Sequence, residues 1–140
     1  MYRYISQKNR RIVKQRAHWL CEYCKALALY APSPFDIDHI IPIVLGGSSD
    51  LENLAHSCSG CNQCKSDKTT VTDPTTGQQI PLFHPRKDNW NDHFKWNDEA
   101  LHIVGITLKG QLTVETLDMN RKKLVNFRRA LKALGVHPPK

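Results

Sequence analysis

The sequence lacks any apolar run long enough to cross a membrane. Its longest runs, residues 26–31 and 40–45, hold six residues each, whereas a membrane-spanning helix needs about 20. The N-terminus also lacks the charged and then apolar segment of a secretory leader. Both absences predict a soluble, unexported protein of the cytoplasm that has no membrane partner.

Apolar residues are scarce as well, at 40% of the 140 residues. This content is low for a domain that relies on its hydrophobic core alone. The chain also lacks an internal repeat, a low-complexity tract or a convincing linker. These features predict a single domain over residues 1–140 that a bound metal would help to stabilise.

The cysteines are few but are arranged in pairs. Cys21 and Cys24 form one CxxC pair, and Cys58 and Cys61 form a second. An odd total of five cysteines, in CxxC pairs of an unexported chain, favours metal thiolates over disulfides. Four thiolates at this spacing can hold a structural zinc ion. Cys64 leaves an ambiguity, because Cys61-x2-Cys64 is also a CxxC pair.

The net charge of +7 is distributed unevenly. Residues 1–30 hold seven Lys/Arg and one acid, residues 31–80 hold two and six, and residues 81–140 hold eleven and six. Basic ends around an acidic centre fit a protein that binds a polyanion at its edges and offers carboxylates to a cation in between. Many soluble domains are basic without binding nucleic acid, so charge alone does not show that this chain binds a polyanion.

The first half of the chain predicts a helix, a strand, a loop, a strand and a helix. Ser6 is a good N-cap for a basic helix that reaches Leu20. Alternating apolar residues around Ile37 predict a short strand that ends by Pro42. A glycine- and serine-rich loop, a second extended segment and a helix follow at residues 46–50, 54–57 and 59–68.

The second half predicts a hairpin, a strand and a long helix. A turn at residues 73–77 is expected to close a hairpin between Val71 and Leu82. Residues 102–108 read as a strand that ends at Lys109-Gly110. Apolar residues then recur at helical spacing from Thr113, taken as an N-cap, to Gly135, taken as a C-cap.

The first half contains, in order, Cys21-x2-Cys24, Asp38-His39-Ile-Ile-Pro, Gly46-Gly47, Asn53-Leu54 and Cys58-x2-Cys61-Asn62. Taken together, these motifs resemble the HNH endonuclease family. The resemblance covers about residues 18–68 and is that of a short bacterial or phage HNH protein with a four-cysteine zinc site. It implies an α+β fold with a ββα-metal (His-Me finger) core, flanked by a basic N-terminal helix and a C-terminal strand-helix extension over residues 69–140.

By this resemblance the chain is a metal-dependent endonuclease that hydrolyses DNA phosphodiester bonds. His39 is the general base, and Asp38 and Asn62 hold a catalytic Mg²⁺ or Mn²⁺. Asn53 braces the loop and the backbone of the histidine. Because the family has Asn directly after its last zinc ligand, Cys61 is that ligand, and Cys64 is a packed thiol.

One geometric condition attaches to this reading. Adjacent residues on a regular strand point to opposite faces, so Asp38 and His39 address one phosphate only if the strand bends or ends there. Alternatives also stay open for two residues. Without the resemblance, Asn53 is better read as a plain turn asparagine, and His56 is equally an extra site residue or a strand-surface residue.

Basic residues outside the motifs are candidates for contacts with the DNA backbone, and for each of them a solvated role is the alternative. They are Lys65, Arg86, Arg128 and Arg129. Two other functions compete with the DNA endonuclease: a non-catalytic zinc module that only binds nucleic acid, and a nuclease that prefers RNA or structured nucleic acid. The joint presence of Asp38, His39 and Asn62 disfavours the first, since binding alone needs none of them. The recognition sequence and the oligomeric state are not encoded in these patterns.

Overall fold

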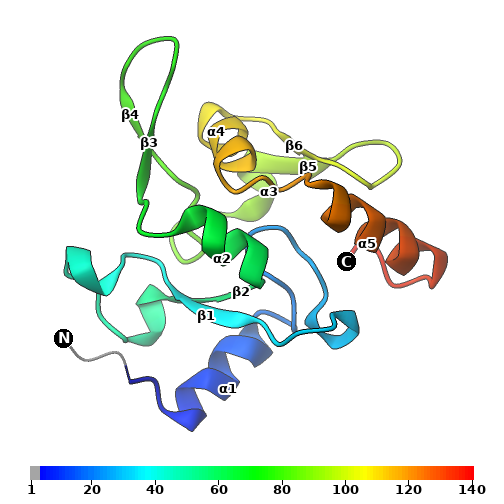
Figure 1. Ribbon diagram of the computed structural model, residues 1–140, viewed down its shortest axis with the longest axis horizontal. Helices are drawn as coiled ribbons and strands as arrows, with labels where there is room; N and C mark the ends of the chain where they lie inside the picture. Colours follow the sequence, from blue (N-terminus) through cyan, green and yellow to red (C-terminus); the bar gives the residue numbers. More distant parts are fainter. Residues whose placement is uncertain (1–3) are drawn as a thin grey trace.

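The computed structural model describes residues 4–140. Its first half places a two-stranded antiparallel sheet between two helices (Figure 1). Strand β1 (Asp36–His39) pairs with β2 (Leu54–Ser57), and α1 (Gln7–Arg16) packs against β2. Helix α2 (Ser59–Lys65) follows β2 directly and packs against β1. This is the strand, loop, strand and helix order that the sequence predicts.

Helix α1 begins as predicted but ends early. The Ser6 hydroxyl accepts a hydrogen bond from the backbone N–H of Asn9 at 3.1 Å and caps the helix. The helix ends at Arg16 rather than at Leu20, because His18 and Trp19 adopt positive φ angles of 53° and 62°.

The inner face of α1 fixes the helix to the sheet. Val13 is buried in a small apolar cluster with Ile5 and Leu54. The Arg16 guanidinium donates to the backbone oxygens of Leu51 and Leu54, each at 2.7 Å. Arg16 therefore joins α1 to the start of β2.

The connections in the first half contain three short 3₁₀ helices, and α2 is shorter than predicted. Helix α2 ends at Lys65, three residues before the predicted end, and Ser66 follows it with a positive φ of 49°. The 3₁₀ helices are η1 (Ala28–Tyr30), η2 (Ile43–Leu45) and η3 (Leu51–Asn53).

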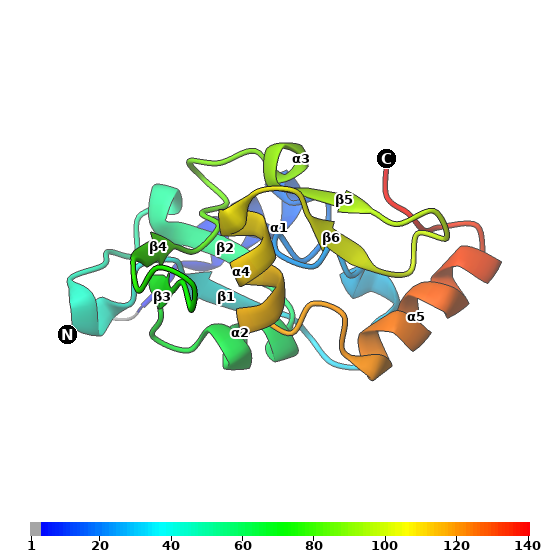
Figure 2. The same cartoon turned by 90° about the horizontal axis from the view of Figure 1, so that it is seen from above.

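Residues 69–140, the C-terminal extension, fold beside this first half (Figure 2). The predicted hairpin is present as β3 (Thr70–Thr72) paired with β4 (Gln79–Pro81). The remaining elements comprise a second antiparallel strand pair and three helices. They are α3 (Trp90–His93), β5 (Phe94–Trp96), β6 (Ile103–Gly105), α4 (Leu108–Thr116) and α5 (Lys122–Ala133).

The predicted long helix from Thr113 to Gly135 is wrong. Two helices occupy this region, and Thr107 caps the first of them, accepting the N–H of Gly110 at 3.0 Å. Thr113 lies inside α4, where its buried hydroxyl accepts the N–H of Phe83 at 3.1 Å. The predicted strand end at Gly110 is also wrong, because Gly110 is helical and packs on the His93 carbonyl, which a Cβ would meet at 2.0 Å.

The extension packs against the cysteine-containing turns of the first half. The main buried cluster combines Cys21 and Tyr23 with Phe83, Phe94 and Leu124 of the extension. Residues far apart in the sequence therefore share one core.

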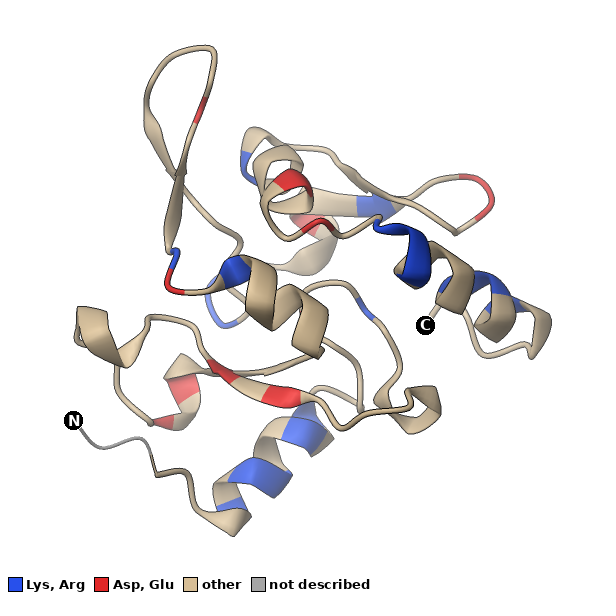
Figure 3. Ribbon diagram, in the orientation of Figure 1, with Lys and Arg blue, Asp and Glu red and all other residues tan. Residues whose placement is uncertain are grey.

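The basic residues of the two ends of the chain and the acidic residues of its centre lie on different elements. Figure 3 shows Lys and Arg along α1 and α5, and Asp residues along β1. Within the described residues 4–140, no helix has the length and apolar character needed to cross a membrane.

Candidate functional site

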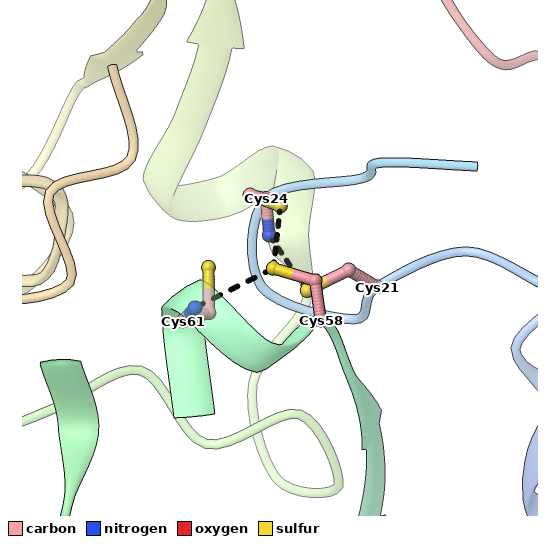
Figure 4. Close-up of side chains that lie close together, drawn as sticks. All are labelled: Cys21, Cys24, Cys58 and Cys61. Carbon is pink, nitrogen blue, oxygen red and sulfur yellow. Dashed lines mark hydrogen bonds between the residues drawn. The ribbon is translucent and has the colours of Figure 1, made fainter. Parts of the chain in front are cut away.

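Two turns bring four cysteine sulfurs together in the interior (Figure 4). Cys21 and Cys24 come from the turn after α1, and Cys58 and Cys61 come from the junction of β2 and α2. In each turn the N–H of the second cysteine donates to the sulfur of the first at 3.4 Å. We call these turns the first knuckle (residues 21–24) and the second knuckle (residues 58–61).

The spacing of the sulfurs fits a tetrahedral zinc ion. All four lie within 4.8 Å of one another, and the Cys24 and Cys58 sulfurs are 3.6 Å apart. Zn–S bonds of about 2.3 Å in a tetrahedron place sulfurs about 3.8 Å apart. Hydrogen bonds among the four thiols lower the pKa of Cys58 and raise the pKa of Cys24 and Cys61, as expected for closely packed thiols that share protons. The four-cysteine cluster is therefore a zinc-type metal site, and Cys64 is outside it, packed against the core.

A polar cavity opens beside the second knuckle, at the carboxyl end of β1. It encloses about 400 Å³ between β1, η2 and α2. Asp38, His39 and Asn62 all line it. Strand β1 ends at His39. The alternation of side chains between the two faces of a strand also ends there, so the adjacent residues Asp38 and His39 can both line the cavity.

Asp38 is fixed by two donors. The Tyr23 hydroxyl donates to Oδ2 at 2.7 Å, and the Lys65 ammonium lies 3.2 Å from the same oxygen. Oδ1 is held less tightly, since Lys65 is 3.4 Å away from it. Burial raises the pKa of Asp38, while the Lys65 charge and the Tyr23 hydrogen bond act in the opposite direction.

Asn62 is oriented by a carboxylate outside the cavity lining. Its amide nitrogen donates to Oδ2 of Asp36 at 3.1 Å. A carboxylate can only accept, so this bond turns the NH₂ end of Asn62 toward Asp36 and leaves its oxygen for another partner. An amide oxygen is a suitable ligand for a hard divalent cation.

His39 and Asn53 are both held by the loop between the two strands. Nε2 of His39 lies 3.0 Å from the Ser49 hydroxyl. Oδ1 of Asn53 accepts the N–H of Ile41 at 2.9 Å, and Nδ2 donates to the Ile41 and Ser48 carbonyls at 3.0 and 2.7 Å. Asn53 thus crosslinks the two ends of the loop that carries Ser49.

Residues 21–68 match the family model of the HNH endonucleases. We refer to the matched residues 21–68 below as the HNH domain. It contains both knuckles and every residue that lines the cavity. No curated protein and no solved structure shows significant similarity to the chain.

Two basic residues predicted to contact DNA have other roles around the HNH domain. Lys65 is 2% exposed, and its ammonium donates to the Ile40 carbonyl at 2.9 Å as well as holding Asp38. Arg128 is 1% exposed and donates to the carbonyls of Leu101 and Met119. Neither side chain is accessible to a phosphate in this structure.

The two other basic candidates differ from each other. Arg86 forms an ion pair with Glu22, inside the first knuckle, and is mostly buried. Arg129 is exposed on α5, where its guanidinium donates to the side chain of its neighbour Asn126 at 2.8 Å. Arg129 is thus the one of the four that keeps an accessible charge.

The structure also tests the two readings of His56. It further identifies site residues that the sequence did not reveal. His56 is 1% exposed in β2, with Nδ1 2.8 Å from the Leu20 carbonyl, so it is neither a cavity residue nor a surface residue. Tyr23 and Ser49 were not predicted. A tyrosine between two zinc ligands and a serine in a polar loop carry no distinguishing signal, because their partners are remote in the sequence.

Proposed function

We propose that the chain is a metal-dependent endonuclease that hydrolyses DNA, with His39 as the general base. The observation that supports this best is the convergence of Asp38, His39 and Asn62 on one open polar cavity. That cavity lies beside a helix anchored by the zinc-type cluster. A rigid support of this kind keeps reacting groups in fixed positions.

In this proposal Asp38 and Asn62 hold a Mg²⁺ or Mn²⁺ ion in the ββα-metal arrangement. Asp38 offers the loosely held Oδ1, and Asn62 offers the oxygen that its bond to Asp36 leaves available. Lys65 is absent from the cavity lining, so it compensates the charge of Asp38 without occupying the space of the metal ion. Such an ion supplies charge stabilisation for the phosphate and the leaving oxygen.

His39 takes the proton of the attacking water. Imidazole is the side chain that most often serves as a general base in enzymes. Ser49 contacts the ring at Nε2 and orients it within the cavity. Asn53 keeps the Ser49 loop in place through its bonds to Ile41 and Ser48. Water attack that expels the 3′ oxygen leaves 5′-phosphate and 3′-hydroxyl ends.

The experiment is plasmid cleavage with and without Mg²⁺ or Mn²⁺, for the native protein and His39→Ala. We expect the substitution to lower the cleavage rate by a factor of about 10² to 10⁴, the usual contribution of a general base. Zinc content and DNA affinity should stay native, because His39 belongs to neither function. His102→Ala is a matched control, since His102 is exposed and lies outside the cavity lining.

The competing functions give different results in the same assay. A protein that shifts DNA in gels but never cleaves it, with any divalent ion, is the non-catalytic zinc module. Faster cleavage of RNA or of branched DNA than of plasmid redefines the substrate without affecting the role of His39. Near-native cleavage by His39→Ala rejects the proposed base.

A further inference from the structure

Arg121 brings a positive charge from the C-terminal extension to the four-cysteine cluster. Its Nη2 donates to the sulfur of Cys58 at 3.2 Å, and its Nη1 lies 3.8 Å from the sulfur of Cys61. Both sulfurs belong to the second knuckle, which lies 60 residues or more before Arg121 in the sequence. In the sequence alone, this arginine is indistinguishable from the other cations of a basic helix.

The guanidinium is held in place from its other side. Nη1 also donates to the carbonyl of Asp118 at 3.1 Å and lies 3.4 Å from the carbonyl of Leu117. Leu117 is the C-cap of α4, where the backbone carries a negative partial charge, and Asp118 follows it directly. Arg121 is therefore oriented before any metal binds and loses little side-chain freedom on meeting the sulfurs.

The second knuckle has the shape needed to admit this group. Gly60 lies between the two cysteines, and a Cβ there would come within 2.4 Å of Nη2 and 2.7 Å of the central carbon of the Arg121 guanidinium. Any larger residue at position 60 must displace the guanidinium. Since glycine is otherwise unfavourable inside a helix such as α2, its presence agrees with a requirement for space.

The charge of the occupied site explains why a cation matters there. Four thiolates around Zn²⁺ carry a net charge of −2, and Cys21, Cys24 and Cys61 are fully buried. Buried charge that lacks a counter-charge is unfavourable. N–H···S bonds from a guanidinium place a compensating charge directly on two of the sulfurs.

We propose that Arg121 is a functional part of the zinc site, supplied by the extension, and that it slows zinc release by neutralising the Cys58 and Cys61 thiolates. The metal remains bound by the four cysteines alone. Arg121 is a positioning and charge-compensating residue that acts on the ligands rather than on the metal. This role requires the zinc-type site but does not require nuclease activity.

The experiment measures zinc release from the protein of residues 1–140 to a chromogenic chelator at neutral pH. We expect Arg121→Met to release zinc about ten to a hundred times faster than the native protein, as for other substitutions of residues that support metal ligands. Gly60→Ala should also accelerate release, although alanine improves helix propensity. Arg121→Lys, which keeps a charge but loses the two-pronged geometry, should lie between native protein and Arg121→Met.

A matched control separates charge compensation from general loosening of the extension. Arg128→Met removes a buried arginine of the same extension whose guanidinium donates to the carbonyls of Leu101 and Met119 instead of to sulfur. In cobalt-substituted protein, removal of the N–H···S bonds should shift the thiolate-to-cobalt charge-transfer band for Arg121→Met and Gly60→Ala, and the band should stay unchanged for Arg128→Met. The proposal is overturned if Arg121→Met keeps the native release rate. Equal release rates and identical cobalt spectra for Arg121→Met and Arg128→Met would overturn it too.

Discussion

At the scale of single residues, the hydrogen bond between Asp36 and Asn62 decides which end of the amide is available to a cation. Asp36→Ala removes the acceptor and frees the amide to rotate. We expect the affinity for Mn²⁺ at the cavity to fall about tenfold to a hundredfold. Electron paramagnetic resonance of zinc-loaded protein titrated with Mn²⁺ measures this change.

Asp36→Asn is the conservative control for that prediction. It keeps an oxygen acceptor for Asn62 but removes the negative charge, so it should retain much of the Mn²⁺ affinity. If Asp36→Asn and Asp36→Ala lose affinity equally, Asp36 acts through its charge or as a direct ligand. Native affinity in both variants would contradict an orienting role.

His137 gives the stability of the protein a pH dependence that can be isolated. It is 8% exposed, and its Nε2 lies 2.7 Å from the carbonyl of Ala100. Burial lowers the pKa of His137, the hydrogen bond to the Ala100 carbonyl opposes this shift, and the charges of Arg128 and Lys132 add to it. As pH falls below about 6.5, the unfolded state binds a proton at this position before the folded state does, and stability is lost.

We therefore expect the thermal midpoint of the native protein to drop more between pH 7.5 and 5.5 than that of His137→Gln. Loss of zinc in acid affects both proteins, so the difference between the two slopes reports His137. Parallel slopes would show that His137 has the same pKa in both states.

The residues predicted correctly from the sequence share one property, which is a local pattern that dictates their geometry. A CxxC turn presents two sulfurs whatever surrounds it, and the four predicted zinc ligands do cluster. The orientation of Lys65 and Arg128 depends instead on carbonyls that other elements supply, and a basic side chain looks the same in the sequence whether it is solvated or buried. The roles of Asp38, His39 and Asn62 remain predictions, although the structure places all three at one cavity.

At the scale of elements, the break between α4 and α5 shows where periodicity misleads. Apolar residues continue at helical spacing across it, but Asp118 adopts a positive φ of 48° and the chain turns before α5 begins. The turn places Arg121 at the N-terminal end of α5, against the second knuckle. A single uninterrupted helix would not present Arg121 to the sulfurs in this way.

The exposed cations of α5 lead to a prediction about DNA binding. Lys122, Lys123 and Arg129 are exposed, in contrast to the buried Arg128. Replacing these three with glutamine should flatten the slope of log affinity against log salt by roughly one for each phosphate that the variant no longer neutralises. Fluorescence anisotropy of labelled duplex DNA across a range of salt concentrations measures the slope.

Helix α1 supplies the comparison for this measurement. Lys8 and Arg11 are exposed there, and Figure 3 shows basic residues along α1 as well as along α5. If the α5 variant keeps the native slope while Lys8→Gln with Arg11→Gln flattens it, the phosphate contacts lie on α1. An unchanged slope in both variants would assign the two basic faces to solvent.

At the scale of the whole molecule, the extension and the HNH domain are joined at both knuckles. The Trp90 indole N–H donates to the carbonyl of Tyr23 at 2.8 Å, and Arg86 pairs with Glu22, so the first knuckle is held by two residues of the extension. Arg121 holds the second. The HNH segment therefore has its zinc-type site enclosed by residues that lie outside the family match.

These contacts support a proposal that residues 1–140 form one cooperative domain, and a truncation tests it. A fragment of residues 1–68 keeps the four cysteines but loses Trp90, Arg121 and the extension's share of the core. We expect it to bind zinc more weakly than the full chain and to lack a cooperative thermal transition, because a small domain has little apolar area to spare. Calorimetry and a competitive zinc titration of both proteins give the answer. A fragment that melts cooperatively near the native midpoint with native zinc affinity would show that the HNH domain folds independently of the extension.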